Sequence, residues 1–208
     1  VEAAKAGDAR ALDALRREHL PAVQGWLARR GLGADAEDLG QEALLALIGS
    51  ALKKADPAAG RFRSLVFAVA RHVLLRHHER AGAQKRGAGR VVSLDDFDPG
   101  APREVEDDFD REWLAALVQT ALGRLAKEHP PYFEAVRRFV LLEQPQAAIA
   151  AELGLSANAV KKQVLRGKRK LADYLREEVR AYAASPEDYE VELREMARLL
   201  GPLGADLA

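Results

Sequence analysis

The sequence predicts an all-α protein, and three observations support that prediction. Ala, Leu, Arg and Glu dominate the 208 residues, whereas aromatic residues make up only 6% of them, and this composition favours helices over strands. Apolar residues recur at helical spacing along most of the chain. No stretch alternates apolar and polar residues over enough positions to indicate a strand.

The first part of the chain is expected to form three helices. Apolar periodicity predicts a helix over residues 8–30, which Pro21 is expected to bend or split. Asp35 is a candidate N-cap for a second helix, because a carboxylate accepts hydrogen bonds from the first free backbone N–H groups. The periodicity then predicts a third helix from about Phe62 to Arg80.

An acidic stretch that also contains glycine and proline follows. Only Arg103 and Arg111 oppose its carboxylates, and we interpret it as a flexible linker, with helices resuming near Glu112. The predicted organisation is two small helical domains joined by an acidic flexible linker, plus a C-terminal extra helix. The expected bounds are residues 1–90 for the first domain, 91–112 for the linker, 113–184 for the second domain and 185–208 for the C-terminal extension.

The strongest local pattern is QAAIAAELGLSANAVKKQVLRGKRK, residues 146–170. Gly154 suits a sharp turn that needs a positive φ, and Ser156 suits the N-cap of the helix after it. Lys and Arg total 32, as do Asp and Glu, but no acid interrupts residues 161–170. The pattern predicts a helix-turn-helix whose second helix enters the DNA major groove. A solvated basic face on an ordinary helix is the weaker alternative.

Little in the sequence indicates catalysis, a metal or a membrane. There is no cysteine, which excludes disulfides, thiolate metal sites and cysteine nucleophiles. There is no HExxH motif, phosphate-binding glycine loop or nucleophile elbow, so we expect no enzyme activity, metal or cofactor; a metal site built on His72 is the weaker alternative. Apolar runs such as Leu65–Ala70 are too short to span a bilayer, so we expect no membrane insertion and a cytoplasmic location.

Two blocks together resemble the extracytoplasmic-function group of RNA polymerase sigma factors, over residues 5–182. The first is DAEDLGQE, Asp35–Glu42, followed by FRSLVFAVAR, Phe62–Arg71. The second is the helix-turn-helix with YFEAVRRFVLL, Tyr132–Leu142, before it. The resemblance implies an alternative sigma factor, which binds core RNA polymerase and directs it to particular promoters. It also implies an anti-sigma protein as a further partner.

The resemblance implies three contact surfaces. The helix that starts near Asp35 would bind the polymerase clamp, through an acidic polar surface that suits basic residues on the partner. The same acids also suit a helix N-terminus without any partner. The implied polymerase-binding residues are Asp35, Glu37, Asp38, Gln41 and Glu42.

The other two surfaces would contact promoter DNA. The third helix would engage the proximal promoter element, and the helix-turn-helix would read the distal one. A charged solvent-facing helix side is the alternative for the third helix. The implied proximal-element residues are Arg61, Arg63, Arg71, His72, Arg76, His77 and Arg80, and the distal-element residues are Ser156, Asn158, Lys161, Lys162, Leu165, Arg166, Lys168 and Arg169.

Three positions depart from the family pattern. Relatives often carry an aromatic residue in place of Leu65 and asparagine in place of His72, where bases of the opened strand are expected to be held. Ala148 stands where an acidic residue is common.

Two alternatives remain open at the level of sequence. A stand-alone helix-turn-helix regulator would explain residues 146–170, but it gives no role to Asp35–Glu42 or to the acidic linker. The acidic helix expected over residues 187–200 either competes with DNA for the basic recognition helix or caps the second domain.

Overall fold

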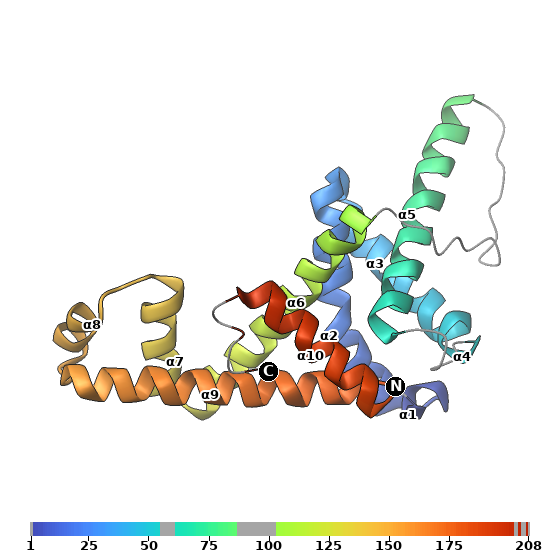
Figure 1. Ribbon diagram of the computed structural model, residues 1–208. Coiled ribbons are helices and arrows are strands. Elements are labelled where there is room, and N and C mark those ends of the chain that lie inside the picture. Colours follow the sequence, from blue (N-terminus) through green and yellow to red (C-terminus); the bar gives the residue numbers. More distant parts are fainter. Residues whose placement is uncertain (1, 55–60, 87–102, 202–203, 205–206, 208) are drawn as a thin grey trace. The chain divides into compact units, whose positions relative to one another are not determined.

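The computed structural model describes residues 2–54, 61–86, 103–201, 204 and 207. All regular elements among these residues are helical, which confirms the all-α prediction (Figure 1). The elements are α1 Glu2–Lys5, α2 Ala9–Leu27, η1 Ala28–Leu32, α3 Ala36–Ala46, η2 Leu47–Ala51, α4 Leu52–Lys54, α5 Phe62–Arg86, α6 Arg103–Glu128, α7 Pro130–Val136, η4 Arg137–Leu141, α8 Gln146–Leu153, α9 Ala157–Tyr182 and α10 Pro186–Leu200, with η marking π-helical turns.

The chain divides into two compact units. Unit 1 comprises Val1–Ala116 and Tyr182–Asp188, and unit 2 comprises Leu117–Ala181 and Tyr189–Ala208. Both α6 and α9 therefore contribute residues to each unit.

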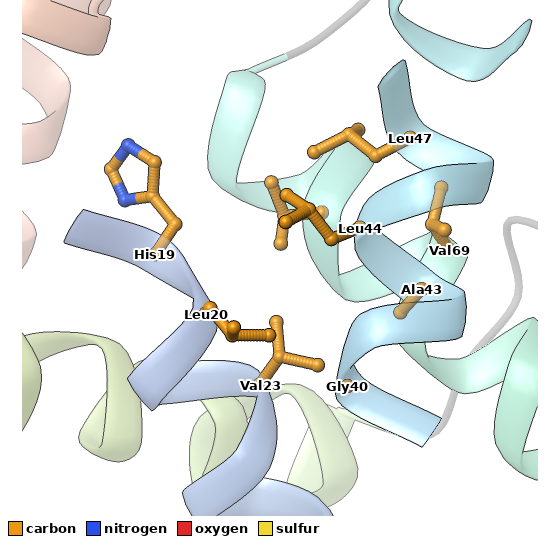
Figure 2. Close-up of a pocket in the computed structure, with 9 residues that line it drawn as sticks. His19, Leu20, Val23, Gly40, Ala43, Leu44, Leu47 and Val69 are labelled. Carbon is orange, nitrogen blue, oxygen red and sulfur yellow. The ribbon is translucent and has the colours of Figure 1, made fainter. Parts of the chain in front are cut away.

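Unit 1 is built on the packing of α2, α3 and α5. Asp8 caps α2 by accepting a hydrogen bond from the Ala11 backbone N–H at 2.8 Å. Gly40 lets α3 approach α2 closely, because a Cβ there would lie 2.7 Å from Cγ of Gln24. Figure 2 shows the apolar pocket at this junction, which holds only about 10 Å³. That volume is at the lower limit for one water molecule, so the junction is a packed core and not a ligand site.

Several helix bounds differ from the sequence-based expectation. Pro21 does not split α2, which runs unbroken from Ala9 to Leu27. Asp35 occupies the N-cap position of α3, but its side chain makes no capping hydrogen bond. α5 continues to Arg86 instead of ending near residue 80.

Part of the predicted acidic linker is helical. Residues 91–102 of the expected linker lie outside the described residues, whereas residues 103–112 are the first turns of α6. Phe109 and Trp113, four residues apart, are 0% and 1% exposed. Burial of two large rings on one helix face stabilises these turns, and that burial is invisible in the acid-rich composition.

Unit 2 contains the helix-turn-helix. α8 lies beside the amino-terminal end of α9 (Figure 1). A buried cluster joins α7, α8 and α9, and Phe139 and Leu153 pack against it. The cluster residues are Ala135, Ile149, Ala150, Val160 and Val164.

Candidate nucleic-acid and polymerase interfaces

The outer side of α3 is acidic and exposed. Its buried side holds Leu39, Gly40 and Ala43, so the positions between them face solvent. Glu37, Asp38 and Gln41 are exposed, as the sequence predicts.

Leu45 is a feature of this surface that the sequence reading missed. Its side chain is 71% exposed, and it follows Asp38 and Gln41 at helical spacing on the same side of α3. The signal was present in the run LLALI, which holds more apolar residues than one helix face can bury. An exposed leucine beside carboxylates is typical of a protein-binding surface.

Two of the predicted polymerase-binding residues instead meet predicted DNA-binding residues. The Glu42 carboxylate lies 3.4 Å from the Arg80 guanidinium, and Asp35 lies 3.9 Å from Nε2 of His77. These pairs join α3 to α5 within unit 1. Glu37, Asp38 and Gln41 therefore remain the more accessible part of the α3 surface.

The predicted proximal-element residues do not all lie on one exposed face. Arg71 and Arg76 on α5, and Arg61 directly before it, are partly exposed. Arg63 and His72, however, are only 2% and 7% exposed. Arg63 and His72 are therefore not accessible to DNA in this conformation.

The buried Arg63 side chain has a specific ion-pair partner. Its Nη1 lies 3.3 Å from the carboxylate of Asp110 on α6, and Asp110 is itself only 8% exposed. A buried guanidinium requires such a partner, because desolvation of an unpaired charge is costly.

The turn of the helix-turn-helix has the predicted geometry. Gly154 adopts φ +64°, and the Leu155 backbone N–H donates to the Ala150 carbonyl at 2.9 Å. Ser156 caps α9 by accepting a hydrogen bond from the Ala159 N–H at 3.1 Å. Leu155, between the two helices, is 36% exposed, whereas Leu153 packs on the core cluster.

The outer face of α9 is basic and accessible. Lys161, Lys162, Arg166 and Arg169 are exposed, and within the described part of the chain none of them forms an ion pair. Leu165 lies among them and is 46% exposed. A row of unpaired cations around an apolar side chain can contact both phosphates and base edges in a major groove.

Lys168 differs from its neighbours on α9. Its side chain is partly buried, and Nζ lies 5.5 Å from the ring centroid of Phe139 on η4. This cation–π contact directs Lys168 toward η4. Asn158 and Ser156, by contrast, are exposed at the start of α9.

An ion-pair network ties the first helix of the helix-turn-helix, α8, to α7 and η4. Arg138 contacts Glu134 at 2.6 Å and also pairs with Glu152 on α8. Hydrogen bonds from Arg137 and Arg138 lower the pKa of Glu134 to about 2. Glu134 therefore stays ionised at any physiological pH and keeps α8 tied to α7 and η4.

A second network joins α6 to α9 within unit 2. Arg124 lies 2.8 Å from Glu177 and 3.3 Å from Glu178. Tyr174 donates a hydrogen bond to Glu128 at 2.6 Å, and this bond raises the pKa of Tyr174 to about 12.

Neither a metal cluster nor a membrane span is found in the part of the chain that the structure describes. No group of three or more His, Cys, Asp and Glu side chains there could hold a metal ion. The described helices are too short or too polar to cross a membrane.

Two family models match the chain in the same order as the structural units. The sigma-70 region 2 model matches residues 15–84, which include α3 and most of α5. The sigma-70 region 4 model matches residues 116–171, which include the helix-turn-helix. Together they cover more than half of the chain, and the protein therefore belongs to the sigma-70 family of RNA polymerase factors.

The pair of matches also defines the function. The chain is an alternative sigma factor that binds core RNA polymerase and directs promoter-specific transcription initiation, and not a stand-alone regulator. No curated protein and no solved structure matches the chain.

Proposed function

We propose that this sigma factor belongs to the extracytoplasmic-function group and works through three surfaces. In this proposal α3 binds the polymerase clamp, α5 engages the proximal promoter element, and α9 reads the distal element. The observation that supports it best is the accessible, unpaired basic face of α9 directly behind a well-formed helix-turn-helix turn. The order of the two matched regions, with only residues 85–115 between them, fits the two-domain pattern of that group.

The polymerase contact is assigned to the exposed side of α3. Glu37, Asp38 and Gln41 supply polar and negative groups, and Leu45 supplies apolar area that water now covers. Negative charge speeds encounter with a basic partner, whereas a buried leucine contributes affinity. Glu42 belongs to this surface less directly, because it pairs with Arg80.

The DNA contacts are divided between the two units. We assign Arg71 and Arg76 on α5, and Arg61 directly before this helix, to the phosphate backbone of the proximal element. On α9 we assign Lys161, Lys162, Leu165 and Arg166 to base edges. Asn158, Lys168 and Arg169 are assigned to phosphates, with Lys168 needing to leave Phe139 first.

Two finer points belong to the same proposal. Sigma factors act on RNA polymerase in the bacterial cytoplasm, and we place this protein there. An anti-sigma protein that covers both domains is the partner we expect to control it.

Co-elution with core RNA polymerase on size exclusion tests the polymerase contact. We expect wild-type chain to co-elute, and we expect Asp38→Arg to weaken binding about tenfold or more, because a like charge then faces the basic partner. Glu190→Arg on α10 is the matched control, since Glu190 is also exposed, and it should bind as wild type does. Failure of the wild-type chain to bind, with and without residues 186–208, would contradict the proposal.

A further inference from the structure

The first half of α6 contacts α2 and the start of α5 within unit 1. Phe109 is completely buried, and its ring centroid lies 5.9 Å from that of Trp26 and 5.2 Å from that of Phe67. Trp113, one turn later, stacks on His19 at 4.5 Å with an angle of 5° between the rings. This segment is therefore seated on unit 1 by aromatic contacts.

Three ion pairs accompany the aromatic contacts, and all have the same polarity. Asp110 pairs with Arg63 at 3.3 Å, and Asp108 pairs with Arg30 at 3.6 Å. Glu112 pairs with Arg29. In each case α6 supplies the carboxylate, and η1 or α5 supplies the guanidinium. Three carboxylates of the segment, at positions 108, 110 and 112, therefore each meet an arginine of unit 1.

The surface beneath this segment has the chemistry of a single-stranded nucleic-acid site. The Arg30 guanidinium lies 4.1 Å from the ring centroid of Trp26, and Arg29 and Arg63 flank the same region. Proteins bind single strands by placing arginines along the phosphates and aromatic rings against the bases. Against such a surface the α6 carboxylates occupy the place of phosphates, and the Phe109 ring occupies the place of a base.

We propose that the acidic first half of α6 occupies a single-stranded-DNA-binding surface formed by Arg29, Arg30 and Arg63 around Trp26 and Phe67. The opened promoter strand binds there only after it displaces this segment. The proposal rests on the proposed function for the identity of the ligand, and it adds Arg29, Arg30 and Trp26 to the DNA-binding residues. It also explains why Arg63, on the helix assigned to the proximal element, is buried in the free protein.

Displacement of the segment sets the apparent affinity for DNA. A ligand that binds only the open form has its affinity reduced by the fraction of molecules in that form. Weakening the α6 ion pairs therefore strengthens DNA binding without adding any contact to DNA. Removing acids elsewhere on α6 changes the net charge by the same amount. It leaves unchanged the fraction of molecules in which the segment covers the DNA-binding surface.

Neutralising substitutions in the full-length chain test this. Asp110→Asn with Glu112→Gln removes two of the ion pairs. Glu106→Gln with Asp107→Asn is the matched control, because these acids lie on the same helix and form no ion pair within the described residues. Anisotropy of a labelled single-stranded oligonucleotide should show about tenfold tighter binding for the first variant. The control should stay within about twofold of wild type.

The native tryptophans report whether the contact opens. The chain contains two tryptophans, Trp26 and Trp113, and both lie at this contact. Acrylamide should quench their fluorescence more strongly in the Asp110→Asn/Glu112→Gln variant, and also when the oligonucleotide binds to wild type. Arg30→Ala in the open variant should remove the gained affinity.

A disulfide gives an independent test in a protein that keeps Asp110. A Cβ at Gly25 would lie 4.0 Å from Cγ of Glu112, so Gly25→Cys with Glu112→Cys places two sulfurs within bonding reach. The natural chain has no cysteine to interfere. The oxidised protein should bind the oligonucleotide at least about tenfold more weakly than the same protein after reduction.

Two results would overturn the inference. One is increased quenching without any gain in oligonucleotide binding by Asp110→Asn/Glu112→Gln. The other is equal binding by the oxidised and reduced cysteine variant. Neither result would contradict the proposed function, which is tested separately by co-elution with core polymerase. Conversely, failure to bind polymerase would leave the oligonucleotide comparison valid as a test of the surface.

Discussion

Three aromatic rings enclose His19 in unit 1. Trp113 stacks on it, the Tyr182 ring meets it edge-on at 5.5 Å, and the Phe62 ring lies at 5.3 Å. Burial lowers the pKa of His19 to about 3. Nδ1 of this imidazole has no hydrogen-bond partner within the described residues. The imidazole is therefore held neutral in the folded protein at physiological pH.

A neutral buried histidine makes stability fall as pH falls. The unfolded chain takes up a proton on His19 below about pH 6.5, whereas the folded chain does not until about pH 3. This contribution is fully present above pH 6.5 and is lost progressively below it. Between pH 7.5 and 5.5 we expect His19 to reduce the unfolding free energy by about 1.4 kcal/mol. Urea unfolding of wild type and of His19→Leu at pH 7.5 and pH 5.5 measures this loss of unfolding free energy. An equal loss in the two proteins would contradict the expectation.

Gly167 permits the close approach of α7 and α9. A Cβ there would lie 2.5 Å from Cγ2 of Val136 and 3.0 Å from the Tyr132 carbonyl oxygen. We expect Gly167→Ala to destabilise unit 2 by about 1–3 kcal/mol, because the backbone oxygen cannot yield as a flexible side chain can. Gly123→Ala on α6 is the control, since nothing lies within 4 Å of its added methyl, and it should be neutral or slightly stabilising. Thermal unfolding followed by circular dichroism compares the two.

At the scale of the element, the proposed function divides the residues of α9 between base contacts and phosphate contacts. Arg169→Ala should weaken promoter binding by the holoenzyme similarly at every distal sequence and reduce the salt slope by about one. Arg166→Ala should cost about 1–3 kcal/mol and relax sequence preference at one position. Binding measured over a salt series, on promoters altered one base pair at a time, distinguishes these effects. Identical behaviour of the two variants would mean that the assignment along α9 is wrong.

Local sequence signals predicted the helix-turn-helix well. Gly154 and Ser156 act within a few residues of themselves, through a positive φ and a capping hydrogen bond, so their roles follow from the motif. The position of Lys168 could not be predicted, because it depends on Phe139, which is distant in sequence. Exposed charge on α9 follows from helical periodicity, but the direction of one long side chain does not.

At the start of α6, by contrast, the local sequence signals predicted the wrong structure. Its first turns are acidic and follow glycines and prolines, so local composition indicated a linker. They are helical because Phe109 packs on Trp26 and Asp110 pairs with Arg63. Both partners come from earlier helices, and a single sequence gives no sign of such pairings. The same reason explains why burial of Arg63 was not expected.

At the scale of the whole molecule, most of the C-terminal extension belongs to unit 2. Leu200 and Leu207 line an apolar cavity of about 80 Å³ together with residues of α6, α7, η4 and α9. Met196 on α10 is 1% exposed. Among the described residues, no ion pair joins the acids of α10 to Lys161–Lys170. These contacts favour the capping role over competition with DNA.

Removing the extension should therefore destabilise the protein and not activate it. Met196→Ala is expected to cost about 2–5 kcal/mol of unfolding free energy, because a fully buried side chain leaves a cavity. Deletion of residues 186–208 should lower the midpoint of urea unfolding further and leave promoter affinity of the surviving folded protein unchanged. Stronger promoter binding after the deletion would instead support competition by the tail.

The sharing of α6 between the two units bears on how the protein can be dissected. A fragment that stops at residue 112, at the end of the expected linker, retains the whole match to sigma-70 region 2. It lacks Trp113 and Tyr182, however, and these supply two of the three rings around His19. Water would then reach the imidazole, and its pKa would return toward 6.5. Such a fragment gains an ionisable group near neutral pH that the intact protein does not have, and its properties are not those of the same residues in the whole chain.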